Sequence, residues 1–135
     1  MLWKPMQSLD TNCLLRWLLD DVPENTILIN ARINSGVTFT VADAAIIETI
    51  FVLEKIIKIS RESIEEAIFM IIEKDSISCN LELFIEILQI YISHPKLSIV
   101  DCYLEVLARK TGNVPLLTFD KKLANQLSGA QLLSS

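Results

Sequence analysis

The fold is decided by residues 37–58, VTFTVADAAIIETIFVLEKIIK, in which a β-branched run leads directly into an apolar helical run. The first part of this stretch alternates and is rich in Val and Thr, which favours a strand. We expect Asp43 to cap the helix that follows, over residues 44–58. A strand followed closely by a helix is the unit that builds parallel sheets covered by helices, so the stretch predicts an α/β protein.

The same alternation of strand and helix continues on both sides of this stretch. Further strands are expected at residues 6–9, 77–79 and 116–119. Helices are expected at residues 13–19, 23–35, 81–92 and 121–127, and one more begins after Ser60. A further helix is expected to begin at Ile99 or Asp101 and to run to Lys110. Ser60, Ser98 and Asp120 are in position to cap helices. No internal repeat or linker is visible, so residues 1–135 are predicted to form a single domain.

The composition excludes several classes of protein. The chain has 135 residues, 51% of them apolar, and only three Gly and four Pro, which excludes collagen-like and low-complexity chains. Charged residues such as Glu48 interrupt the longest apolar runs before they could span a membrane. The N-terminal residues lack the apolar core of a signal peptide, so we expect a cytoplasmic protein. Cys13, Cys79 and Cys102 have no CxxC spacing, which indicates reduced thiols rather than disulfides or a zinc site.

The net charge of −5 restricts the ways in which the chain could bind nucleic acid. An acidic chain has no broad electrostatic attraction for phosphates. It can still be a metal-dependent nuclease, because the metal site of such an enzyme must itself be acidic. If four of the acids bind a metal ion, the rest of the chain is nearly neutral.

Four acids are expected at one edge of the predicted sheet. In open α/β sheets, ligands bind beyond the carboxyl ends of the strands. Asp10 follows the first strand and Asp120 the last, Asp101 begins a helix, and Glu48 lies in the second turn of the helix after VTFTV. Each aspartate is equally suited to capping a helix, so both interpretations stay open for these three. Glu48 interrupts the apolar surface of its helix, and a buried glutamate needs a partner, a proton or a cation.

A cluster of these acids would need a counter-ion. Two carboxylates ~5 Å apart repel each other by about 3 kcal/mol at an effective dielectric constant of roughly 20. Ligation by oxygen without nearby His or Cys selects Mg²⁺ or Mn²⁺, which serve phosphoryl chemistry. Thr11 and Asn12 could orient a metal-binding aspartate, or simply satisfy amides at a helix start. Thr118 could hydrogen-bond a carboxylate or a bound water.

Four motifs follow one another along the chain: LDTNCLLRWLLDD at 9–21, IIETIFVLEK at 46–55, SIVDCYLEVLARKTG at 98–112 and LLTFDKKLA at 116–124. In order and spacing they resemble the PIN-domain proteins, most closely the VapC-type toxins of prokaryotic toxin–antitoxin pairs. The resemblance implies a PIN-like three-layer fold, with helices flanking a central, mostly parallel sheet of about 4–5 strands. It also implies that the metal-binding, catalytic acids are Asp10, Glu48, Asp101 and Asp120.

The resemblance further implies a Mg²⁺- or Mn²⁺-dependent endoribonuclease that hydrolyses phosphodiester bonds of single-stranded or structured RNA. It implies that the chain is the toxin of a pair and is held by an antitoxin protein. The high apolar content indicates an additional buried surface, which we expect to form a homodimer or to receive an antitoxin helix. The alternative is a PIN-like module that binds RNA or protein without catalysis. A phosphoacceptor receiver domain is disfavoured, because Asp10-Thr11-Asn12 offers one acid where that fold needs a pair.

Overall fold

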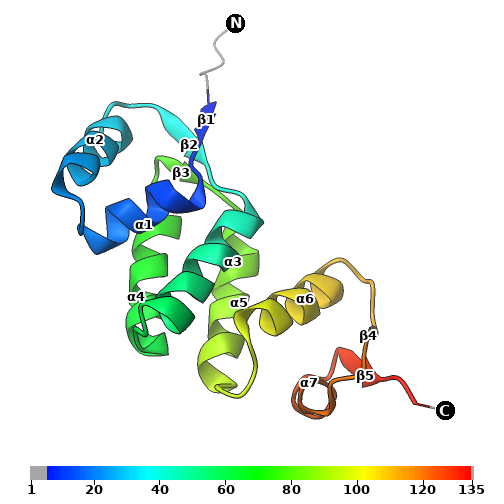
Figure 1. The fold of residues 1–135 in the computed structure, drawn as a ribbon. Coiled ribbons are helices and arrows are strands. Elements are labelled where there is room, and N and C mark those ends of the chain that lie inside the picture. The colour runs from blue at the N-terminus through cyan, green and yellow to red at the C-terminus, as the bar shows by residue number, and fades with distance from the viewer. Residues whose placement is uncertain (1–5, 135) are drawn as a thin grey trace, which may run out of the picture. The chain divides into compact units, whose positions relative to one another are not determined.

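The computed structural model describes residues 6–134, and the chain divides into two compact units, Met1–Leu81 and Glu82–Ser135, each described here by itself. In both units short strands alternate with helices, and every strand pair among the described residues is parallel (Figure 1). The predicted α/β class with parallel strands is therefore confirmed. Within residues 6–134, no helix has both the length and the apolar character needed to cross a membrane.

The N-terminal unit contains a three-stranded sheet and most of the helices. Its sheet has the order β1-β2-β3, with Gln7 opposite Phe39 and Phe39 opposite Ile77. Because these strands are parallel, their carboxyl ends lie at one edge, where α1 and α3 begin. The elements are β1 (Met6–Ser8), α1 (Thr11–Leu19), α2 (Pro23–Ile33), β2 (Thr38–Thr40), α3 (Asp43–Phe51), the π-helix η1 (Val52–Ile56), α4 (Arg61–Ile72) and β3 (Ile77–Ser78).

The helices of this unit begin where the sequence provides a cap or a proline. The side chain of Ser60 accepts a hydrogen bond from the backbone N–H of Ser63 and so starts α4, as predicted. Pro23 occupies the first turn of α2, where its missing N–H costs nothing. The apolar face of α4 is buried at helical spacing, with Ile64, Ile68 and Ile71 at most 1% exposed.

The helix after β2 differs from the prediction in two ways. Asp43 does not cap it, because Ala42 holds the N-cap position and Asp43 lies in the first turn. The carboxylate of Asp43 instead accepts a hydrogen bond from Asn80 Nδ2 at 3.0 Å. The α-helix also ends at Phe51 and continues as the π-helix η1, in which the N–H of Ile57 donates to the carbonyl of Val52.

The C-terminal unit contains a two-stranded parallel sheet, and α5 begins at its boundary. Leu117 of β4 lies opposite Gln131 of β5. The second strand was not predicted, because AQL is only three residues long and has no β-branched residue. The rings of Phe84 and Tyr103 stack between α5 and α6, with centroids 6.3 Å apart. The elements are α5 (Leu81–Ser93), α6 (Ile99–Lys110), β4 (Leu116–Thr118), α7 (Lys121–Gln126) and β5 (Ala130–Leu132).

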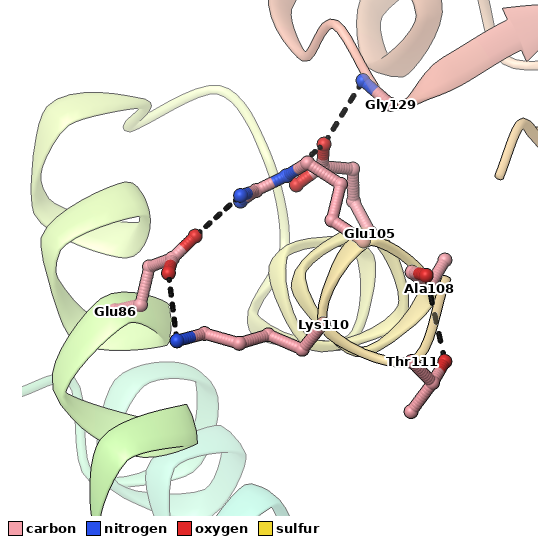
Figure 2. A network of polar contacts seen from close by, with 7 residues as sticks. Glu86, Glu105, Ala108, Lys110, Thr111 and Gly129 are labelled. Atoms are coloured by element: carbon pink, nitrogen blue, oxygen red, sulfur yellow. Dashed lines mark hydrogen bonds and ion pairs between the residues drawn. The ribbon is translucent and has the colours of Figure 1, made fainter. Parts of the chain in front are cut away.

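A chain of charged contacts links α5, α6 and the turn before β5 (Figure 2). The carboxylate of Glu86 forms ion pairs with both Arg109 and Lys110. Arg109 Nε also donates a hydrogen bond to Glu105 Oε2 at 2.8 Å. The same oxygen accepts a hydrogen bond from the backbone N–H of Gly129 at 3.0 Å. Glu105 is only 1% exposed, and sequence analysis did not identify it. The network therefore fixes the segment before β5 against α6.

Candidate metal centre

Asp10 and Glu48 are brought together in the N-terminal unit. Both line a pocket of about 330 Å³, whose walls also include Thr11 and Asn12. Asp10 lies just past the end of β1, after Leu9, and Glu48 lies on α3, which contacts α1. The expected placement of these two acids at the carboxyl edge of the sheet thus agrees with the structure. Glu48 is exposed at the pocket, however, whereas the sequence had suggested a mostly buried position.

Asp10 also caps α1. Its Oδ1 accepts a hydrogen bond from the backbone N–H of Cys13 at 2.8 Å. Hydrogen bonding to Cys13 lowers the pKa of the Asp10 carboxyl below its usual value of 3.8, because the bonded form is the ionised one. A carboxylate has two oxygens, so Asp10 can cap the helix and bind a cation at the same time. Capping fixes the side chain on the wall of the pocket.

Asp101 lies in the first turn of α6 in the C-terminal unit and does not cap that helix. The cap is Ser98, whose Oγ accepts a hydrogen bond from the backbone N–H of Asp101 at 3.1 Å. The capping interpretation of Asp101 is therefore wrong, and that of Ser98 is confirmed. The half-buried carboxylate of Asp101 is therefore not needed to cap α6.

Asp120 joins β4 to α7 and caps that short helix, as predicted. Its Oδ1 accepts hydrogen bonds from the backbone N–H groups of Lys122 at 2.8 Å and Leu123 at 3.3 Å. Thr118 holds the backbone of Asp120, because Thr118 Oγ1 accepts a hydrogen bond from the backbone N–H of Asp120 at 2.9 Å. The two interactions together set the direction of the Asp120 side chain.

The donor set at the N-terminal pocket fits a hard divalent cation. Carboxylate, hydroxyl and amide groups line it, and these oxygen donors suit Mg²⁺ or Mn²⁺. Within the stretch from residue 6 to residue 134, no group of three or more His, Cys, Asp or Glu residues is arranged to hold a metal ion. The structure thus supplies one pair of acids at a shared pocket, and Asp101 and Asp120 separately in the C-terminal unit.

Comparison with known proteins assigns the family. The model of the PIN domain family matches residues 8–126, which is most of the chain and includes all four acids. The chain therefore belongs to the PIN domain family, whose members are typically Mg²⁺-dependent nucleases. A search of curated proteins found no match.

Proposed function

We propose that this chain is a Mg²⁺- or Mn²⁺-dependent endoribonuclease whose metal ligands are Asp10, Glu48, Asp101 and Asp120. The observation that carries the proposal is the pocket shared by Asp10 and Glu48, which lie far apart in the sequence. Membership of the PIN family supports nuclease chemistry. The inclusion of Asp101 and Asp120 is supported by the four motifs, which lie within the residues that the PIN domain model matches.

The residues of the chain have separate tasks in this proposal. A bound divalent ion would lower the pKa of a water molecule and stabilise the negative charge on the phosphate. Asp10, held by its hydrogen bond to the Cys13 amide, and Glu48 would bind the ion from the N-terminal unit. Thr11 and Asn12, on the wall of the same pocket, would orient the Asp10 carboxylate or a water molecule. Thr118 would keep Asp120 in place through its backbone.

We also propose that the protein is the toxin of a toxin–antitoxin pair and that it forms a homodimer. The toxin role is supported by the likeness of the four motifs to VapC-type toxins. A partner surface is supported by large apolar side chains exposed on α3, η1 and α4: Phe51 at 45%, Ile56 at 64% and Met70 at 64%. The toxin role is tested by expressing the protein in bacterial cells. The parent should arrest their growth, and Asp101→Asn should not. Light scattering tests the homodimer, and Ile56→Glu should yield a monomer.

The nuclease proposal is tested with a fluorescent single-stranded RNA. The parent protein should cleave this RNA in the presence of Mn²⁺ or Mg²⁺, and cleavage should stop when EDTA is added. Glu48→Gln should not cleave the RNA. RNA binding without cleavage under all metal conditions would instead identify the alternative, a PIN-like binding module. Glu48→Gln is purified in parallel, and its inactivity shows that the preparation contains no contaminating ribonuclease.

A further inference from the structure

A second pocket, of about 350 Å³, lies between α1 and α2 and adjoins the candidate metal centre. Asp10 and Asn12 line both pockets, so the two adjoin at these residues. The α1–α2 cleft is therefore within reach of the unit next to a bond that is cleaved at Asp10. The volume is near the lower end of the range for small-ligand pockets, about 300–1,000 Å³.

Two guanidinium groups line this cleft, those of Arg16 on α1 and Arg32 on α2. Arg16 Nη1 contacts Asp21 at 2.6 Å, and Arg32 Nη1 donates to the neutral Gln7 at 3.3 Å. Each contact engages one of the five N–H donors of an arginine, so the remaining donors can bind oxygen atoms of a ligand. The guanidinium fork matches the geometry of a phosphate group.

The remaining wall of the cleft is apolar. Leu28 and Ile29 of α2 line it, and Leu28 is 69% exposed. An apolar side chain at the edge of a cleft suits the face of a nucleobase, whereas the two arginines suit the phosphates on either side of that base. The two arginines offset the carboxylates of Asp10, which also lines the cleft, and of Asp21, which pairs with Arg16, so the cleft is less acidic than a chain with a net charge of −5 is on average.

We propose that the α1–α2 cleft binds the nucleotide next to the cleaved bond of a single-stranded RNA. Arg16 and Arg32 contact its phosphates, and its base lies against Leu28 and Ile29. A cleft of this size admits one unstacked nucleotide rather than a duplex, which makes single-stranded RNA the substrate class. The inference rests on the proposed ribonuclease function, because that function brings RNA to Asp10.

The experiment measures binding of a fluorescent single-stranded RNA by anisotropy in EDTA, over a series of salt concentrations. Arg16→Gln and Arg32→Gln should each weaken binding about 3- to 10-fold and lower the salt slope by about 0.7 per lost phosphate contact. Leu28→Ser should weaken binding without changing the slope. Asp10→Asn should tighten binding, because one charge that repels phosphate is removed.

The control is Lys58→Gly, which removes an exposed positive charge at a residue whose φ of 66° suits glycine. It should leave both the affinity and the salt slope unchanged. The proposal is overturned if both arginine variants bind RNA as the parent does, or if the parent binds no RNA. In the first case, continued Mn²⁺-dependent cleavage by the parent would leave the ribonuclease function intact and show that the nucleotide does not bind in the α1–α2 cleft.

Discussion

Asp10 and Glu48 line the same pocket although α1, α2 and β2 separate them along the chain. The parallel pairing of β1 with β2 brings this about, because it places the end of β1 and the start of α3 at one edge of the sheet. Two carboxylates at one pocket repel each other, and a divalent cation relieves the repulsion. The stability of the metal-free protein and its response to metal therefore both depend on these residues.

Asp10→Asn should preserve α1 while weakening metal binding. Asparagine caps helices about as well as aspartate, so stability should stay within about 0.5 kcal/mol, whereas Asp10→Ala should lose about 0.5–2 kcal/mol. Both variants should show a smaller Mn²⁺-induced rise in melting temperature than the parent. Thermal melts with and without Mn²⁺ check this. A full Mn²⁺ shift in Asp10→Asn would mean that Asp10 only caps the helix.

Glu48→Gln should leave the metal-free protein at least as stable as the parent. The exposed side chain keeps its volume and loses a charge that opposes Asp10. Cleavage should fall by at least about 100-fold, because a ligand charge is lost from the metal. The matched control is Glu62→Gln, which removes a charge from the first turn of α4. A variant with reduced stability and parental cleavage would show that Glu48 is structural.

Glu86 should make part of the stability depend on pH. Burial acts to raise the pKa of its carboxyl, but hydrogen bonds from Arg109 and Lys110 outweigh burial and hold the pKa below its usual 4.5. A carboxyl whose folded pKa lies below the unfolded value stabilises the protein above about pH 4.5, and this contribution is lost as pH falls through the folded pKa. Urea unfolding should therefore show Glu86→Gln less stable than the parent near pH 7. The difference should shrink on acidification, and a constant difference would contradict the account.

Gly129→Ala should destabilise the C-terminal unit. An added Cβ would lie 2.5 Å from Glu105 Oε2 and 2.9 Å from Arg109 Cγ, inside the network of Figure 2. Glu105 is 1% exposed and cannot move aside freely, so we expect a loss of about 1–3 kcal/mol in unfolding free energy. Ser128→Ala, at the exposed neighbouring position, is the control and should be close to neutral. Equal stability of the two variants would show that the network yields without cost.

The features that could be predicted best from the sequence are those that depend on residues close together along the chain. Ser60, Ser98 and Asp120 each cap a helix by accepting an N–H from two or three residues further on, and such caps follow from local sequence alone. The nearness of Asp10 and Glu48 could also be predicted, because the sheet-edge rule places the end of the first strand and the helix after VTFTV at one edge.

Features that depend on distant contacts could not be predicted in this way. Asp43 was expected to cap α3, but it bonds Asn80, which is distant in sequence. The burial of Glu105 depends on Gly129 and could not be inferred from the helical pattern of α6, although its spacing from Arg109 was a local hint of an ion pair. The π-helix η1 has the same apolar spacing as an α-helix, so periodicity does not distinguish them.

Cleavage of single-stranded RNA by Asp101→Asn in the presence of Mn²⁺, with Ser98→Ala as the control, decides whether the metal centre has four carboxylates. Ser98, not Asp101, caps α6, so Asp101→Asn should leave the fold stable, whereas Ser98→Ala should cost about 1 kcal/mol. We expect Asp101→Asn to bind Mn²⁺ more weakly and to cleave RNA at least about 100-fold more slowly, while Ser98→Ala retains both Mn²⁺ binding and cleavage. Parental cleavage and Mn²⁺ binding by Asp101→Asn would contradict the four-carboxylate metal centre.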